Sequence, residues 1–301
     1  MSEDEPLIAG VELGGTKCIA VLARGRQVLE QARWPTLSPA ATLPMIAAKL
    51  EGWRDREDVA ALGIASFGPL CLTAGDERHG RIVNTPKAGW SDIDVRGTLS
   101  RGFPGPVGFD TDVAGAALAE GLWGASVGCG THVYLTVGTG VGGAIVVDGR
   151  PLHGAVHPEI GHIRIRRAAD DTFAGSCPFH GACIEGLVSG PAITARAGIP
   201  VDQLAANDPI WRRVGGELAE LTAMLILTVS PHRIVIGGGV AERRPMLFPI
   251  IHAATSELLN GYLVGQRPHE LERLIVAPGL GHEAGPLGAV ALGHSAIGGQ
   301  P

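Results

Sequence analysis

The sequence has little positive charge and no long apolar run, and each lack excludes a class of protein. Lys and Arg number 24 against 30 Asp and Glu, and the formal net charge of -6 argues against a surface for nucleic acid, although not against a local nucleotide pocket. No apolar stretch reaches the roughly 18 residues of a membrane span, because threonines interrupt the longest one, residues 221–229. The acidic start MSEDEPLIAG lacks the apolar core of a signal peptide. We therefore expect a cytoplasmic protein without nucleic-acid or membrane partners.

Cysteine is scarce as well. The chain has five cysteines, an odd number, and Cys18, Cys71 and Cys129 are scattered through apolar segments. This pattern is typical of buried free thiols and favours a reducing compartment over a disulfide framework.

Glycine, in contrast, is abundant. It supplies 45 of the 301 residues, about twice the usual share of ~7%. Glycine permits tight turns and close approach of the backbone to a ligand, so this excess is an indication of function. A chain of this length is at or above the size at which one hydrophobic core divides, and we expect two lobes.

A glycine turn between two short apolar strands occurs near the start of the chain. Residues 7–11 and 18–22 are the expected strands, and Glu12-Leu13-Gly14-Gly15-Thr16-Lys17 is the turn. The paired glycines let backbone N–H groups approach a phosphate, Thr16 adds a hydroxyl, and Glu12 could hold a hydrated magnesium ion. The turn lacks the GKS/T ending and the following helix of a Walker loop, and a plain hairpin turn is the alternative interpretation.

The same pattern returns in the middle of the chain. Gly138-Thr139-Gly140-Val141-Gly142-Gly143 separates the expected strands 132–137 and 144–147. An internal repeat of this kind predicts two phosphate-binding hairpins, which is a stronger indication than either copy alone. A third cluster, Gly237-Gly238-Gly239-Val240-Ala241, follows an expected strand at 233–236 and could approach an adenosine with bare backbone.

Hydrophobic spacing predicts the other elements and leaves two ambiguous polar positions between them. The expected strands are 59–65 and 107–109, and the expected helices are 44–53, 114–122, 215–229 and 285–297. Asn84 in the loop 82–90 either contacts a sugar or caps a turn. Asp112, at the start of a helix, is either an N-cap or a general base.

The stretch from Val156 to Ile193 has the residues of a zinc site. Cys177, His180 and Cys183 recur at every third position around Pro178 and Gly181, and His162 could supply a fourth tetrahedral ligand. Glu159 and Glu185 flank the group, so a closed metal site would bring together two hydrogen-bond acceptors that suit a polyol. The alternatives are a surface loop without metal, or a disulfide between two of the cysteines.

Together these motifs resemble the sugar kinases of the ROK family (repressors, open reading frames, kinases), and within it the bacterial fructokinases. The first hairpin, TDVAGAALAE, GTGVGG, HPEIGH with CPFHGACIEGL, SGPAI and GGGV occur in the family's order over nearly the whole chain. The resemblance implies an α/β, two-lobed actin-like (ribonuclease-H-like) fold with a duplicated strand-turn-strand hairpin and a zinc loop, which closes over sugar and ATP. We expect lobes at 1–111 and 112–283, a C-terminal helix at 284–301 that returns to the first lobe, and a homodimer.

The resemblance also implies roles for individual residues. Asp112 matches the catalytic base, which takes the proton of the sugar hydroxyl that attacks the γ-phosphate. The positions that match sugar contacts are Asn84, Thr111, Asp112, Glu159, His162 and Glu185. Those that match the ATP and Mg²⁺ side are Glu12, Gly14, Gly15, Thr16, Lys17, Thr139, Gly140, Pro191, Gly237, Gly238, Gly239, Val240 and Ala241. The matching Zn²⁺ ligands are His162, Cys177, His180 and Cys183.

Two positions depart from the family pattern and bear on the substrate. Glu12 stands where aspartate is usual, so magnesium would be reached through a longer arm or one more water. Thr111 replaces the asparagine of the usual Asn-Asp pair, which weakens a glucokinase assignment and favours D-fructose, phosphorylated at O6. The alternatives are a kinase for glucose, mannose or an N-acyl-hexosamine, and a catalytically inactive sugar-binding regulator. The family's repressors carry an N-terminal helix-turn-helix, for which a first strand near Leu7 leaves no room.

Overall fold

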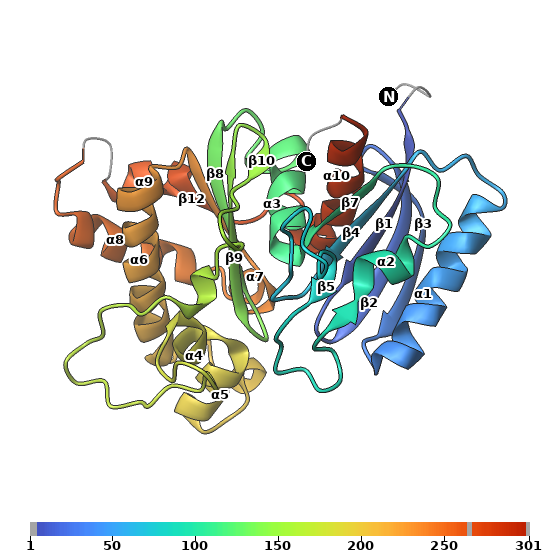
Figure 1. Cartoon of the computed structure of the whole chain (residues 1–301). Helices are drawn as coiled ribbons and strands as arrows, with labels where there is room; N and C mark the ends of the chain where they lie inside the picture. Colours follow the sequence, from blue (N-terminus) through green and yellow to red (C-terminus); the bar gives the residue numbers. More distant parts are fainter. Residues whose placement is uncertain (1–4, 264–266, 299–301) are drawn as a thin grey trace. The chain divides into compact units, whose positions relative to one another are not determined.

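The computed structural model describes residues 5–263 and 267–298, which form two compact units (Figure 1). Unit 1 consists of Met1–Trp123, Pro151–His157 and His282–Pro301, and unit 2 of Gly124–Arg150 and Pro158–Gly281. The ends of the expected ranges 1–111 and 284–301, at Met1–Asp4 and Gly299–Pro301, lie outside the described residues. The observed boundary follows the helix Asp112–Trp123 instead of preceding it, because this helix packs within unit 1.

Unit 1 is built on a mixed sheet. Its strands are β1 (Leu7–Leu13), β2 (Lys17–Arg24), β3 (Gln27–Pro35), β4 (Ala61–Ser66) and β7 (Val107–Thr111), in the order β3-β2-β1-β4-β7. The hairpin β1–β2 is antiparallel, and β1 pairs in parallel with β4, as β4 does with β7. The predicted first hairpin is thus confirmed, whereas β3 was missed because its alternation of half-buried and exposed residues is weak in apolar side chains.

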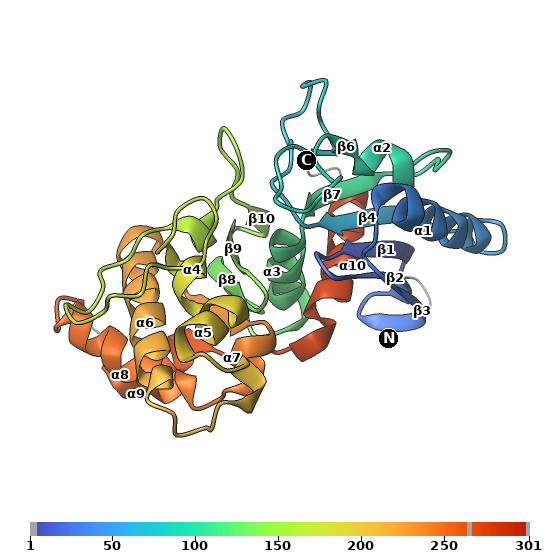
Figure 2. The same ribbon diagram turned by 90° about the horizontal axis from the view of Figure 1, so that it is seen from below.

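Helices cover both faces of this sheet (Figures 1 and 2). Leu7, Ala9 and Val11 of β1 pack with α1 (Pro39–Arg54) and α2 (Val95–Leu99), while Ile8 packs with Val290 of α10 (Ala284–Ile297). The helix α3 (Asp112–Trp123) packs beside α10. The short strands β5 (Arg81–Ile82) and β6 (Ile93–Asp94) pair with each other. The helix α1 begins before the predicted start at Pro44, with Pro39 in its first turn, and tolerates Pro44 in its interior.

Glycine allows α10 to lie directly on the sheet and on α3. A Cβ atom at Gly63 of β4 would lie 1.8 Å from the carbonyl oxygen of Ala289, and one at Gly288 would lie 2.5 Å from the carbonyl carbon of Gly115 in α3. No side chain fits these distances. The close packing therefore fixes the start of α3, where Asp112 lies.

Unit 2 repeats the arrangement. Its sheet has β8 (Thr131–Val137), β9 (Val141–Val147), β10 (Arg150–Pro151), β11 (Arg233–Gly237) and β12 (Ile275–Val276), in the order β10-β9-β8-β11-β12. The β8–β9 hairpin is antiparallel and β8 pairs in parallel with β11. In unit 1, β1 likewise forms an antiparallel hairpin with β2 and pairs in parallel with β4. The predicted internal repeat of strand, glycine turn and strand is therefore confirmed.

The helices of unit 2 complete its core. They are α4 (Ile184–Val188), α5 (Gly190–Ala197), α6 (Ile210–Val229), α7 (Gly239–Arg243), α8 (Leu247–Leu259) and α9 (Pro268–Leu274), with short 3₁₀ turns at Ile160–His162, Val201–Gln203 and Gly281–Glu283. The sequence reading missed α8, α9 and β12. Within the described residues, none of the helices combines the length and the hydropathy that crossing a membrane requires.

Candidate functional site

The first glycine turn is held in shape by contacts from outside it. The Gly14 N–H donates to the Lys17 carbonyl at 3.0 Å, and Thr36 donates from its hydroxyl to the Gly14 carbonyl at 2.7 Å and from its N–H to the Thr16 carbonyl at 3.0 Å. Lys87 Nζ donates to the Gly15 carbonyl at 2.6 Å. Gly15, Thr16 and Lys17 remain exposed at the tip of the turn, where a ligand could reach them.

Glu12 precedes this turn and has the features of a ligand for a hard cation. Its Oε2 atom is buried and makes no hydrogen bond with the described residues. A Cβ atom at Gly285, in the first turn of α10, would lie 2.3 Å from Oε1 of Glu12, so the carboxylate needs a glycine there. Burial raises the pKa of Glu12, against the opposing charges of Lys17 and Arg33. A cation would offset that loss of solvation, and oxygen ligands of this kind suit Mg²⁺.

Asp112 is the first residue of α3 and directly follows β7. The neighbouring Thr111 makes the capping bond, because its Oγ1 accepts from the N–H of Ala114 at 3.1 Å. Asp112 Oδ1 accepts from the N–H of Val113 at 2.9 Å, which orients the carboxylate. The capping role that the sequence allowed for Asp112 is thus taken by the buried Thr111.

Two histidines that the sequence analysis did not single out fasten the segment Pro151–His157 to the rest of unit 1. His153 Nε2 lies 2.7 Å from Oδ2 of the buried Asp110, and His157 Nε2 accepts from the N–H of Leu70 at 3.0 Å. The hydrogen bond to Asp110 raises the pKa of His153. Both histidines line a cavity of about 320 Å³ in unit 1. Asn84 is exposed on its loop in the same unit.

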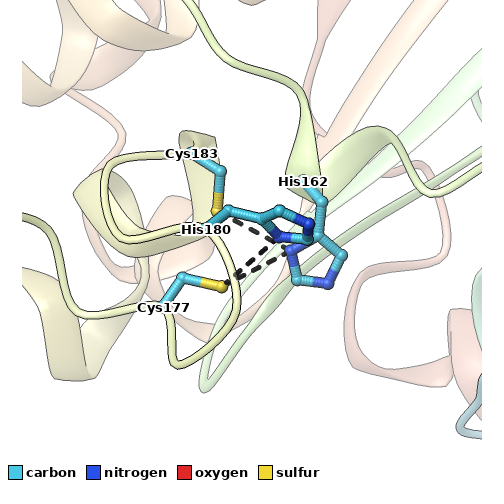
Figure 3. A group of neighbouring side chains, drawn as sticks. All are labelled: His162, Cys177, His180 and Cys183. Carbon is cyan, nitrogen blue, oxygen red and sulfur yellow. Dashed lines mark hydrogen bonds between the residues drawn. The ribbon is translucent and has the colours of Figure 1, made fainter. Parts of the chain in front are cut away.

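The four predicted metal ligands lie together in unit 2 (Figure 3). Their ligand atoms are all within 4.8 Å of one another. His162 Nδ1 lies 3.7 Å from Sγ of Cys177 and 3.6 Å from Sγ of Cys183, and His180 Nδ1 lies 3.8 Å from Sγ of Cys177. Nitrogen and sulfur ligands of a tetrahedral zinc ion lie about 3.6 Å apart, given metal–ligand bonds of about 2.1 and 2.3 Å. The donor set and its spacing therefore fit such an ion.

The local fold explains why these side chains converge. His162 ends the 3₁₀ turn Ile160–His162, and Cys183 is the N-cap residue of α4. Between them, Cys177 and Gly181 exchange two backbone hydrogen bonds of 3.2 and 3.0 Å. Gly181 has a positive φ of 58°, which favours glycine and lets the turn close.

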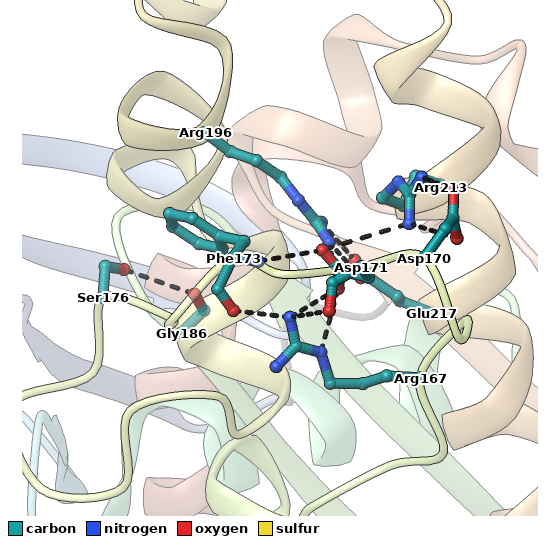
Figure 4. Close-up of polar contacts among 9 residues, drawn as sticks. All are labelled: Arg167, Asp170, Asp171, Phe173, Ser176, Gly186, Arg196, Arg213 and Glu217. Carbon is teal, nitrogen blue, oxygen red and sulfur yellow. Dashed lines mark hydrogen bonds and ion pairs between the residues drawn. The ribbon is translucent and has the colours of Figure 1, made fainter.

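A network of ion pairs holds the segment between His162 and Cys177 (Figure 4). Asp171 accepts from Nη2 of Arg167 and Nη2 of Arg196, each at 2.6 Å, and Arg196 also binds both carboxylate oxygens of Glu217 on α6. The side chains of Asp171, Arg196 and Glu217 are only 5, 8 and 7% exposed. Burial opposes ionisation, but the bonds from Arg196 and Arg167 hold the pKa of Asp171 at about 2.

Glu159 and Glu185 also lie in unit 2 and differ in their contacts. Removal from solvent, and then the charge of Glu185, raise the pKa of Glu159. Glu185 Oε2 accepts from the N–H of Val141 in the second glycine turn at 3.1 Å. One of the two predicted acceptors is therefore bonded to the predicted phosphate turn.

The glycine segments expected on the nucleotide side meet in unit 2. The N–H of Gly190 donates to the Gly138 carbonyl at 2.8 Å, and a Cβ atom at Gly138 would lie 3.7 Å from the nitrogen of Gly239. Thr139 and Pro191 are exposed, whereas Val240 and Ala241 are buried in the core. Backbone from three glycine-containing segments thus lies close together, and glycine permits close approach of backbone to a ligand.

The predicted site residues divide between the two units. Unit 1 contains Glu12, Gly14, Gly15, Thr16, Lys17, Asn84, Thr111 and Asp112. Unit 2 contains Thr139, Gly140, Glu159, His162, Cys177, His180, Cys183, Glu185, Pro191 and Gly237 to Ala241.

Comparison with known proteins reveals similarity along nearly the whole chain. A sequence profile described as the ROK family matches residues 8–296. A fructokinase from Zymomonas mobilis subsp. mobilis is 43% identical over 300 residues, which cover 97% of this chain and 98% of that protein. The crystal structure of a ROK hexokinase from Thermus thermophilus aligns with a TM-score of 0.79 at 28% identity, over 97% of this chain and 99% of that one. A ROK family glucokinase from Streptomyces griseus, in complex with glucose and AMPPNP, aligns with a TM-score of 0.74 at 25% identity, over 96 and 99%.

Proposed function

This chain belongs to the ROK family, and on that premise we propose that it transfers the γ-phosphoryl group of ATP to O6 of D-fructose, giving fructose 6-phosphate. The chain is an ATP-dependent hexose kinase, with the actin-like fold that the sequence motifs predicted. The observation that carries the choice of fructose is the 43% identity to a fructokinase over nearly the full length of both proteins.

The repeated hairpins suit phosphoryl transfer, which depends on positioning and on stabilisation of charge. In our proposal the exposed turn residues Gly15, Thr16 and Thr139 face the phosphates of ATP. Gly238 and Gly239, beside the second turn, and the exposed Pro191 face the adenosine. Mg²⁺ would be held through the buried carboxylate of Glu12 and would neutralise developing charge on the phosphates.

Asp112 is the general base in this proposal. It accepts the proton of the fructose O6 hydroxyl, whose oxygen forms the bond to the γ-phosphorus while the bond to ADP breaks. The bond from the Val113 N–H orients the carboxylate that accepts this proton. Asn84, Thr111, Glu159, His162 and Glu185 are the further residues that we propose to contact the sugar.

Zinc is the metal that we propose for the cluster of His162, Cys177, His180 and Cys183. Two thiolates and two imidazoles suit zinc better than magnesium or calcium, which prefer oxygen ligands. Its role here is structural, because it would tie the 3₁₀ turn that contains His162 to the N-terminus of α4. Thiol ligands and ATP as co-substrate both fit the cytoplasm, which we propose as the compartment. We also propose a homodimer, which light scattering of the pure protein would test.

The experiment that tests the proposal is a panel of sugars at saturating ATP and magnesium, with the phosphorylated carbon identified in each product. Fructose phosphorylated at O6 with the highest kcat/KM is the expected result. A higher kcat/KM for glucose, mannose or an N-acyl-hexosamine would make that sugar, and not fructose, the preferred substrate. No ATP consumption with any sugar would instead identify a sugar-binding regulator.

A further inference from the structure

We propose that Glu185 is a positioning residue for the nucleotide, in addition to its proposed contact with the sugar. The reason is that residues of α4 and α5 form hydrogen bonds with the second glycine turn. This inference rests on the proposed function, since it takes the turn from Gly138 to Gly143 as a phosphate site. It adds a physical link between the sugar side, the metal loop and the nucleotide side within unit 2.

Two hydrogen bonds make the contact. The N–H of Val141 donates to Oε2 of Glu185 at 3.1 Å, and the Gly138 carbonyl accepts from the N–H of Gly190, the first residue of α5, at 2.8 Å. The turn also closes on itself, because the Gly138 N–H donates to the Gly140 carbonyl at 2.9 Å. Both ends of the turn are thereby held, and Thr139 is left exposed at its tip.

The carboxylate of Glu185 packs closely against Gly140 in the turn. A Cβ atom at this position would lie 2.8 Å from Oε2 of Glu185, and Gly140 has no positive φ that would demand glycine for conformational reasons. A methyl group at residue 140 would therefore meet the carboxylate of Glu185 directly. A side chain at residue 140 would displace either Glu185 or the turn.

The helix that carries Glu185 is itself well anchored. Cys183, a proposed zinc ligand, is its N-cap residue, and the Ile184 N–H donates to the Ile163 carbonyl at 2.9 Å. Ile184, Leu187 and Val188 are fully buried. The Ser189 side chain then caps α5, and Arg196 at the other end of α5 joins the buried ion pairs with Asp171 and Glu217. Glu185 is thus presented from a rigid support, as a positioning role requires.

The arrangement predicts coupled binding of the two substrates. One oxygen of Glu185 is engaged by the turn, so a sugar hydroxyl that donates to the same carboxylate would restrict its motion and, through Val141, that of the turn. A sugar that orders the turn in this way would raise the affinity for nucleotide, and the nucleotide would raise the affinity for sugar by the same factor.

The test measures binding of a non-hydrolysable ATP analogue with magnesium by calorimetry, in the absence of sugar. Glu185→Ala removes the acceptor of the Val141 N–H and should weaken binding of the analogue by about tenfold. Glu185→Gln keeps an acceptor oxygen and should retain most of that affinity. Glu257→Ala, at an exposed position on α8 outside the proposed sites, is the control and should leave the affinity for the analogue unchanged. Zinc content and melting temperature of each variant show whether it is folded and metal-loaded.

A second pair of variants uses the close approach at residue 140. Gly140→Ala should weaken binding of the analogue by about tenfold or more, and in the double variant with Glu185→Ala the two losses should not multiply, because the carboxylate that the new methyl meets is gone. Unchanged affinity in Glu185→Ala, or fully multiplicative losses in the double variant, would overturn the inference. Absence of analogue binding to the wild-type protein would instead reject the proposed function.

Discussion

His153 Nε2 and Asp110 Oδ2 are joined at 2.7 Å near the end of β7, just before the helix that begins with Asp112. The other oxygen of Asp110 accepts from the N–H of Thr111 at 2.7 Å. The segment Pro151–His157 is therefore fastened to the end of β7, and the backbone that leads into Asp112 is held by a buried carboxylate whose partner can change its charge.

The first prediction is that this pair makes stability depend on pH. The folded state raises the pKa of His153 above its usual 6.5, so the stabilisation from the charged pair is fully present below pH 6.5 and is lost as pH rises through the raised pKa. We expect the difference in free energy of unfolding between wild type and His153→Ala to shrink as pH rises from about 6 to 8.

Denaturant titrations at a series of pH values would check this prediction. His153→Gln can donate a hydrogen bond but cannot be charged, so its difference from His153→Ala should be independent of pH. His269→Ala, at an exposed position on α9, is the control for loss of a histidine. A constant difference between wild type and His153→Ala across this range would contradict the prediction.

The second prediction concerns Asp112. Asp112→Asn keeps an oxygen that can accept from the N–H of Val113, so folding should change little. Turnover should fall by about 10² to 10⁴, because an amide cannot accept the proton of the sugar hydroxyl. Steady-state kinetics with fructose measure the effect. Asp94→Asn is a matched control, since Asp94 caps α2 in the same unit through a bond from the N–H of Gly97, and turnover should be retained there. Near-normal turnover in Asp112→Asn would remove this residue from the role of base.

The sequence predicted the parts of the site that depend on local pattern. Paired glycines between apolar strands gave both hairpins, and the spacing of Cys177, His180 and Cys183 gave a cluster that His162 joins. These features are readable because the residues that form them are neighbours along the chain, or because few residue types can supply the chemistry.

Contacts between distant residues could not be read in the same way. His153 meets Asp110 across 43 residues, and Asp171 meets Arg196 across 25, with no periodicity that would single out either pair. Residues 163–176, which separate His162 from Cys177, are likewise ordered by contacts with distant parts of the chain. Ile163, Ile165 and Phe173 pack against the core of unit 2, and Asp171 is the centre of buried ion pairs.

The third prediction distinguishes the role of the metal cluster from the role of the buried ion pairs in holding residues 163–176. Cys183→Ser should release zinc, lower the melting temperature and weaken sugar binding, because Glu159 and Glu185 lose a fixed support. Asp171→Asn should retain zinc but lower the free energy of unfolding by about 3 kcal/mol, since Arg196 and Arg167 lose a buried partner. Metal analysis and denaturant titration of both variants check these outcomes. Wild-type protein purified without zinc, or loss of zinc from Asp171→Asn, would contradict this division of roles.

The last prediction is the preference for fructose and its origin at Thr111. This residue is buried, and its hydroxyl oxygen accepts a bond from the N–H of Ala114. It cannot offer the amide that the usual Asn-Asp pair would give to a pyranose hydroxyl, so glucose should leave a polar group poorly paired. A loss of roughly 1 to 3 kcal/mol corresponds to a preference for fructose over glucose of about tenfold to a hundredfold in kcat/KM.

Thr111→Asn tests that origin directly. Asparagine is also a good N-cap, so the bond to Ala114 can be kept while an amide is restored, and kcat/KM for glucose should rise relative to fructose. Thr111→Ser keeps the hydroxyl and is the matched control, with the wild-type preference expected. Mannose should be the second substrate of the wild type. If wild-type protein phosphorylates glucose at a kcat/KM equal to or above that for fructose, Thr111 does not select the sugar and a glucokinase takes the place of our proposal.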